Sequence, residues 1–281
     1  MPRILKRFFL YLVVLGIVVW TVAPYVWLII SSFSFKIDLL TLPLRWIPSR
    51  LTLENYYSLF FSRGSESVNT RLFFQSLGNS AIISFSTMLI CLVLGVLAAY
   101  AIARLRFRGS NLMVLLMMAT QLVPPIVMVV PMYVIMRKMD LLDKHIGLII
   151  VDISIVLPLV IWLRRGYFAS IPSELEDAAR IDGCSHLGAL VRVILPLAGP
   201  GLVSVSIFAF IAAWNEYLYA FIFTSVAAKT LPVLIGEFST KLGLEYLRIA
   251  AAGVLASLPP VLLALVFQRF IIRGLTAGAV K

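Results

Sequence analysis

The polar side chains that could form a site are concentrated in one segment, residues 171–196. Ser173 is followed three residues later by Glu176, a spacing that predicts a capping box at the start of a helix. Ala178 and Ala179 would give this helix a small-residue surface that a partner could approach closely. Gly183 is the usual left-handed stop at a helix end. The chemistry indicated is non-covalent docking, by a helix and a tight turn.

A second helix is expected after that turn. Ser185 can cap it, it would run through His186 to Leu195, and Pro196 would mark the entry to the next span. The alternative is an amphipathic hairpin lying on the lipid surface. Helices that bind anionic lipid are usually basic on their polar face, whereas the first helix here carries three acids and one arginine, Arg180. The acids therefore favour docking over lipid binding.

Catalytic chemistry has no comparable signal. Lys229 and Thr230 follow Val-Ala-Ala rather than glycines, so the chain has no phosphate-binding loop for a nucleotide. No Ser/His/Asp set or carboxylate pair is grouped by spacing. The two histidines are too isolated for a metal site, and Cys91 and Cys184 are expected to be free thiols. We expect no catalytic residue and no metal site.

A second group of polar side chains lies inside apolar runs, where a polar group is costly and usually faces protein or water. These residues are Asn79, Gln121, Asn215 and Glu216. Structural hydrogen bonds between helices are the alternative to a functional role. Pro124-Pro125 should break or kink the run that contains Gln121.

Composition identifies the elements that position these residues. The 281-residue chain is 61% hydrophobic and 13% charged, and its mean hydropathy is +1.01. Several apolar runs exceed the ~20 residues needed to cross a bilayer. The chain is therefore predicted to be an all-α membrane protein, since barrel strands would be short and alternating. The net charge of +11 comes from basic residues at the ends of apolar runs, which indicates lipid headgroups rather than nucleic acid.

We expect six membrane spans in a single domain, 1–281. The first apolar run is too long for a cleavable signal peptide, so it is interpreted as a span with its basic end in the cytoplasm. The expected spans are 8–33, 76–103, 111–136, 146–163, 197–224 and 247–272.

Six spans place both termini in the cytoplasm. Segment 34–75 is then extracytoplasmic, and segment 171–196 and the tail 273–281 are cytoplasmic. Arg104, Arg106 and Arg108 and the pair Arg164-Arg165 support this orientation, because basic residues near span ends favour the cytoplasmic side. The loop residues Arg137, Lys138 and Lys144 oppose it.

The docking segment resembles the signature loop of ABC-importer permeases. Asp177-Ala-Ala179, three residues, Gly183, nine residues and Val193-Ile-Leu-Pro196 are similar to the family pattern Glu-Ala-Ala, three residues, Gly, nine residues, Ile-x-Leu-Pro. Asp177 stands for Glu and Val193 for Ile, and both departures are chemically conservative.

Other motifs extend the resemblance over nearly the whole chain, to the six-span permease subunit of maltose-type importers with its type I fold. They are Asn79-Ser80, Ala99-Tyr-Ala-Ile-Ala-Arg104, Arg106-Phe-Arg-Gly109, Gln121-Leu-Val-Pro-Pro125, Arg180-Ile-Asp-Gly183, Trp214-Asn-Glu216, Thr230-Leu-Pro232 and Gly274-Leu-Thr-Ala-Gly-Ala-Val-Lys281.

The resemblance implies a role for each group of residues. The loop would be a pair of coupling helices seated on a cytoplasmic ATPase subunit, through Ser173, Glu176, Asp177, Ala178, Ala179, Asp182, Gly183, Leu195 and Pro196. Asn79, Gln121, Asn215 and Glu216 would lie in or near the translocation path. The tail from Gly274 would project toward the ATPase dimer.

The resemblance also implies partners. These are a second homologous permease, two ATPase subunits that hold ATP and Mg²⁺, an extracytoplasmic sugar-binding protein, the sugar and membrane lipid, while this chain holds no cofactor. The expected function is sugar import by alternating access, in the plasma or inner membrane, without enzymatic activity on this chain. A permease for an amino acid, polyamine or other solute is the first alternative, and a membrane scaffold or sensor subunit is the second.

Overall fold

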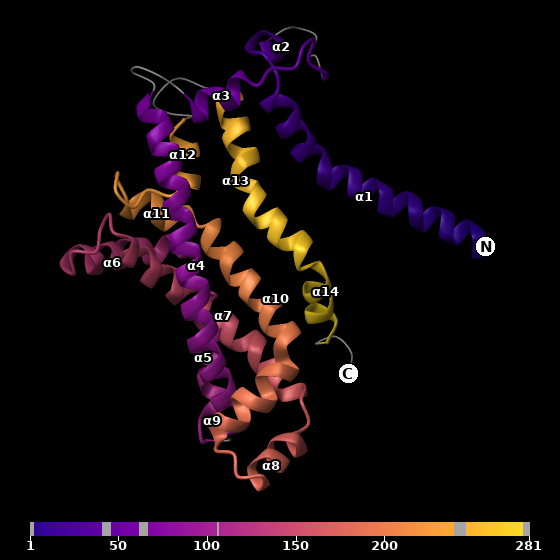
Figure 1. Ribbon diagram of the computed structural model, residues 1–281, viewed down its shortest axis with the longest axis vertical. Helices are drawn as coiled ribbons and strands as arrows, with labels where there is room; N and C mark the ends of the chain where they lie inside the picture. Colours follow the sequence, from indigo (N-terminus) through magenta and orange to yellow (C-terminus); the bar gives the residue numbers. More distant parts are fainter. Residues whose placement is uncertain (1–2, 41–45, 62–66, 106, 239–245, 278–281) are drawn as a thin grey trace. The chain divides into compact units, whose positions relative to one another are not determined.

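The computed structural model describes residues 3–40, 46–61, 67–105, 107–238 and 246–277. Every regular element in these ranges is a helix (Figure 1). The chain forms two compact units, Met1–Phe74 with Leu234–Leu258, and Gln75–Val233 with Pro259–Lys281. Arg106, the segment 239–245 and the last four residues of the tail lie outside the described residues.

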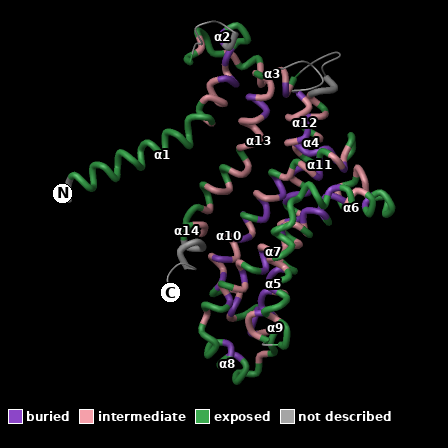
Figure 2. Tube along the Cα trace, turned by 180° about the vertical axis from the view of Figure 1, so that it is seen from behind, coloured by how far each residue is buried: buried purple, intermediate pink, exposed green. Residues whose placement is uncertain are grey.

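The first unit contains α1 (Arg3–Ser32), α2 (Lys36–Leu40) and α3 (Glu54–Phe60). It also contains the start of α4 (Ser67–Arg104), up to Phe74, and most of α13 (Tyr246–Val266), up to Leu258. The Tyr25 and Ser257 hydroxyls lie 2.7 Å apart and join α1 to α13. Asn55 donates to the carbonyl oxygens of Ser32 and Ser34, which fixes α3 at the end of α1. Most of α1 is exposed (Figure 2), as expected of an apolar helix whose surroundings are lipid or another chain.

The second unit is built around α7 (His145–Ser170) and α10 (Leu195–Trp214), which pack against each other. The remainder of α4 (Ser67–Arg104) packs here too, and α14 (Gln268–Ala277) packs on α10. Small and branched apolar side chains fill the core between α4, α7 and α10, namely Cys91, Val156, Val160, Val205 and Ala209. α4 and α7 approach so closely at Gly95 that an added Cβ would lie 2.7 Å from Val160 Cγ1.

Five helices among the described residues are long and apolar enough to cross a membrane, and a bent pair supplies the sixth segment. They are Leu5–Ser32, Thr70–Arg104, His145–Ser170, His186–Trp214 and Tyr246–Val266. The pair consists of α5 (Ser110–Thr120) and α6 (Pro125–Lys138), which meet at 96°. The predicted break at Pro124-Pro125 is confirmed, since α6 starts at Pro125, where a missing N–H costs least.

Arg164 was expected to close the fourth span at the membrane surface, and this prediction is wrong. α7 continues to Ser170, and the Arg164 side chain is fully buried. Its guanidinium donates to the Leu92 carbonyl oxygen (2.7 Å) and to Ser206 Oγ (3.1 Å). Arg165, by contrast, is partly exposed and donates to Asn111 Oδ1. Only one arginine of the pair therefore occupies a position where it could face the headgroups.

The fifth span begins and ends earlier in the chain than predicted. α10 ends at Trp214, and α11 (Leu218–Phe223) is a separate short helix. Glu216 therefore lies in the break between two helices rather than within a continuous span. Its carboxylate accepts hydrogen bonds from the backbone N–H of Tyr219 (2.8 Å) and Ala220 (2.9 Å), donors that the first turn of a helix leaves free.

Candidate functional site

The docking segment begins with α8 (Ser173–Ile181), where the predicted helix is found. The predicted capping box is wrong, because Pro172 is the N-cap and no side chain caps the helix. The proline fixes its own φ, and its following residue starts the helix. Glu176 does not turn back to the helix start but points into the protein, where it is 7% exposed.

α8 ends as predicted at Gly183, which has a φ of +87°. The N–H of Cys184 donates to the Ala179 carbonyl oxygen and the N–H of Gly183 to that of Arg180, both at 3.0 Å. These two bonds form a Schellman motif, which needs a residue in the left-handed region. Glycine adopts this conformation without the steric cost that a Cβ brings.

The second helix of the loop is continuous with the membrane-length helix that follows it. Ser185 Oγ accepts from the Gly188 N–H (3.1 Å) and caps α9 (His186–Ala189), as predicted. α9 then continues through a π-helical turn, Leu190–Ile194, directly into α10. Pro196 was expected to mark the entry to the next span, and it lies in the first turn of α10, but no break separates α9 from that span. A proline ring clashes with the carbonyl four residues earlier, and the wider π-turn just before it provides the room.

The buried carboxylate of Glu176 is the centre of a polar cluster that joins α8 to the end of α4 and extends to the half-exposed His186. One carboxylate oxygen accepts a hydrogen bond from the Tyr100 hydroxyl, and the other lies 3.5 Å from Arg104 Nε. His186 Nδ1 lies 3.7 Å from the first oxygen. Arg104 also donates to the Ile171 carbonyl oxygen (2.6 Å), at the end of α7. We call Tyr100, Arg104, Glu176 and His186 the latch.

Sequence reasoning assigned no role to Tyr100 and used Arg104 only as a marker of orientation, although both belong to a quoted motif. Their spacing of four residues places them on one face of a helix, which is the signal that could have been used. It did not identify their partner, because Glu176 was already explained by the capping box. The latch depends on tertiary contacts that the sequence pattern does not show.

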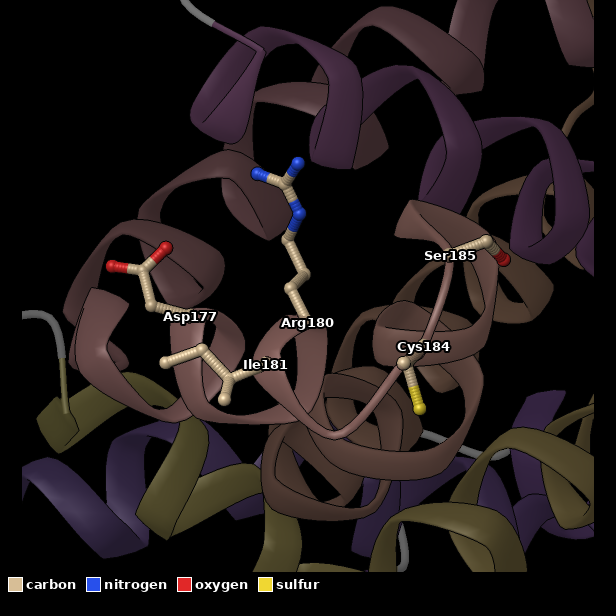
Figure 3. A pocket seen from close by; sticks show the side chains of 6 residues that line it. Asp177, Arg180, Ile181, Cys184 and Ser185 are labelled. Carbon is tan, nitrogen blue, oxygen red and sulfur yellow. The ribbon is translucent and has the colours of Figure 1, made fainter.

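The opposite face of α8 is open to solvent. Asp177, Ala178, Asp182 and Gly183 are exposed, whereas Ala179 is buried, so only one of the two alanines can face a partner. Ile181 is 86% exposed. A shallow depression lies beside it (Figure 3), lined by Asp177, Arg180, Ile181, Gly183, Cys184 and Ser185. At the far end of the loop, Leu195 is half-buried and Pro196 is exposed.

The intramembrane candidates do not form one cluster. Asn79 is buried, donates to the carbonyl oxygens of Ala227 and Lys229 (both 2.9 Å), and its Oδ1 lies 2.7 Å from His145 Nε2. Gln121 is exposed and donates to the Ile155 carbonyl oxygen. Asn215 is exposed beside Glu216. Among the described residues, no hydrogen bond joins any two of these four side chains.

Asp143 holds the segment that Asn79 contacts. Its carboxylate accepts from the backbone N–H of each residue from Ser225 to Ala228 and from Ser225 Oγ. Partial burial tends to raise the pKa of Asp143, but the backbone N–H donors outweigh it and hold the pKa well below its usual range. We call this arrangement the Asp143 nest.

Comparisons with known proteins give the fold and segment a family context. Residues 91–277 match the family described as binding-protein-dependent transport system inner membrane component. The trehalose transport system permease protein of Mycobacterium tuberculosis is 39% identical over 268 residues, covering 94% of each chain. The trehalose/maltose transport system permease protein of Thermococcus litoralis is 34% identical, over 99% of this chain and 98% of that one.

Solved structures agree on the fold. A chain of a bacterial ABC transporter involved in import of the acidic polysaccharide alginate superposes with a TM-score of 0.76 at 24% identity, covering 96% of this chain and 98% of that one. A chain of the methionine ABC transporter superposes with a TM-score of 0.57 at 19% identity, covering 75% of this chain and 99% of that one. At these identities the superpositions establish the architecture of an ABC-importer permease.

Proposed function

We propose that this chain, which belongs to the family of binding-protein-dependent transport system inner membrane components, is the permease of an ATP-driven sugar importer. It is a membrane transport subunit and not an enzyme, since the ATPase of such a system is a separate subunit. A sugar is favoured because two relatives that match 94% or more of this chain are named as a trehalose and a trehalose/maltose transport permease.

The main support for this proposal comes from the docking segment, residues 171–196. The open face of α8 would seat on the cytoplasmic ATPase, with Ser173, Asp177, Ala178, Asp182 and Gly183 at or near the contact. The observation that supports this is one-sided burial. Glu176 and Ala179 fix α8 to the permease, while Ile181 projects almost fully into solvent. A helix that is fixed on one face and open on the other could bind a partner without losing its packing on the permease.

Transport would proceed by alternating access. ATP and Mg²⁺ on two ATPase subunits would close that dimer and move α8, and the movement would open the path formed with a second, homologous permease toward the sugar-binding protein. Asn79, Gln121, Asn215 and Glu216 are proposed to lie in or near this path. In this mechanism this chain would make and break no covalent bonds.

Docking is tested by Ala178→Trp, which places a bulky ring on the open face. We expect the variant to insert in the membrane but to lose co-purification with the ATPase. Ala119→Trp is the matched control, because Ala119 is also exposed but belongs to α5. Normal co-purification of Ala178→Trp would overturn docking through this face.

The path is tested separately by Glu216→Gln, which keeps one oxygen to accept the N–H groups of α11. We expect unchanged co-purification and at least about tenfold slower uptake, as when a charged polar contact is replaced by a neutral one. Loss of assembly would instead make Glu216 a structural residue.

The sugar is tested by binding a panel of mono-, di- and oligosaccharides, with methionine and polyamines as competitors, to the cognate binding protein. Uptake of the bound compound by the assembled complex would follow. A non-sugar solute is the second candidate, because a methionine transporter shares this fold. Binding of an amino acid or polyamine in place of a sugar would decide for it.

Orientation follows from the same proposal. Both termini, the coupling segment and the tail 273–281 would be cytoplasmic, and segment 34–75 extracytoplasmic. In intact cells, an impermeant thiol reagent should label Leu53→Cys and spare Ile181→Cys, in a background where Cys184 is replaced by serine. Both introduced positions are exposed, so burial does not explain the expected difference.

A further inference from the structure

We propose that the latch transmits movement of α8 into α4, so that Glu176 is a positioning residue for coupling and not part of the ATPase contact. The inference rests on the proposed docking of α8, and it adds a second route into the membrane. The first route is the covalent one, from α9 through the π-turn into α10.

The argument begins with where the acids of α8 point. Glu174 and Asp177 are exposed, as acids at a helix start normally are. Glu176 is buried, and Tyr100, Arg104 and His186 lie around its carboxylate. A carboxylate that must leave water needs several good partners, and Tyr100 and Arg104 supply them from one face of α4.

A buried charged pair is a poor way to gain stability, because desolvation offsets most of the attraction. It is an effective way to fix geometry. If α8 moved away from α4, the Glu176 carboxylate would lose Tyr100 and Arg104 together, and the Arg104 guanidinium would be left with the uncharged Ile171 carbonyl oxygen, which is unfavourable. Apolar side chains would permit sliding, whereas the latch requires α8 and the end of α4 to move together.

α4 carries that movement across the membrane. It is an unbroken helix from Ser67 to Arg104, so Asn79 and Tyr100 belong to one rigid element. At 1.5 Å per residue, these two residues are about 30 Å apart along the helix axis. At the far end Asn79 holds the carbonyl oxygens of Ala227 and Lys229, and Ser80 Oγ accepts from the Leu231 N–H (2.8 Å). Tight packing of α4 on α7 at Gly95 leaves little room for slippage.

The closest test keeps all side-chain volumes. Tyr100→Phe removes one hydroxyl and Glu176→Gln removes one charge, and Glu174→Gln is the matched control on the exposed face. Each is assembled with the ATPase and the binding protein in lipid nanodiscs or proteoliposomes. The measured quantities are co-purification, ATP hydrolysis and sugar uptake.

We expect both latch variants to co-purify normally and to hydrolyse ATP, but to import at least about tenfold less sugar per ATP hydrolysed than wild type. The Glu174→Gln control should keep the wild-type ratio. An unchanged ratio in both latch variants would overturn the inference. Loss of co-purification would also overturn it, since Glu176 would then act in docking.

Hydrogen exchange in the permease alone separates the inference from the docking proposal. Residues 173–184 should exchange at least about tenfold faster in Tyr100→Phe, because a hydrogen bond to a charged group is removed. Unchanged exchange would overturn the latch even if docking were correct. Failure of the wild-type permease to bind any ATPase would overturn docking while this measurement still decided whether the latch exists.

Discussion

Glu176 and Asp143 each hold a loop of the second unit, but the first is buried among side chains and the second is half-exposed among backbone amides. Glu176 has two main partners from α4, and Asp143 accepts from four backbone N–H groups and a hydroxyl. The nest fixes the shape of a single loop. The latch fixes the position of one helix on another, so its strength depends on burial rather than on the number of bonds.

The largest effect is expected from breaking the latch at its charge. Arg104→Met removes the arginine from the buried Glu176 carboxylate and leaves it with the Tyr100 hydroxyl and the half-exposed His186, so the free energy of local opening at α8 should fall by about 3 kcal/mol. Hydrogen exchange of residues 173–184 in detergent measures it. Arg108→Met is the control, because Arg108 lies four residues after Arg104 and is exposed. This variant should leave hydrogen exchange of residues 173–184 unchanged. Equal effects of the two changes would remove the distinction between latch and surface charge.

A smaller effect is expected in the nest despite its larger number of bonds. Asp143→Ala should lower the free energy of local opening at 225–228 by about 2 kcal/mol, since solvent replaces part of what the carboxylate provides. Asp140→Ala is the matched control. Both aspartates have a φ of 55°, so both variants carry the same backbone cost, but Asp140 is paired only with the exposed Lys144 in the described chain. If Asp143→Ala lowered the free energy of local opening more than Arg104→Met did, the conclusion that burial determines the strength of these contacts would be wrong.

The turn at Gly183 should contribute about 1 kcal/mol. Gly183→Ala forces a Cβ into the left-handed region, although nothing among the described residues lies within 4 Å of it. Gly109→Ala, at a φ of +92° and with equally open space, should cost the same, and Gly166→Ala, inside α7, should cost nothing. Thermal unfolding measures all three. A neutral Gly183→Ala would show that the turn relaxes.

The smallest effect is a pH dependence confined to the nest. The folded-state pKa of Asp143 lies below its ordinary value of 3.8, so its contribution is fully present above about pH 4 and is lost as the pH falls through the folded-state pKa. The difference in thermal stability between wild type and Asp143→Asn should therefore narrow from pH 6 to pH 3. A constant difference would mean that the carboxylate charge is unimportant there.

These comparisons also define what the sequence could provide. Helix positions, the break at Pro124-Pro125 and the stop at Gly183 follow from local rules, and each is found. The capping box at Ser173 and Glu176 failed because the same glutamate had better partners 76 residues away in sequence, at Tyr100. A local pattern cannot rank a local bond against a distant one.

The membrane boundaries failed for a similar reason. Arg164 looked like a charge at the end of an apolar run, but a carbonyl of α4 and a serine of α10 satisfy it in the interior. Glu216 looked like a charge within a span, but α10 ends before it and α11 starts on its carboxylate. In both cases hydropathy gave only the length of the apolar run, whereas the position of the charged side chain depends on its hydrogen-bond partners.

The uninterrupted passage from α9 through the π-turn into α10 has a mechanical consequence. Residues His186–Trp214 form a single rod of 29 residues, about 43 Å long at 1.5 Å per residue. If such a rod pivots near its cytoplasmic end, a tilt of about 10° sweeps its far end through about 7 Å, more than the 5.4 Å pitch of a helix. A displacement smaller than one side chain near the start of this rod would thus be magnified into a movement of about 7 Å at its far end, Trp214.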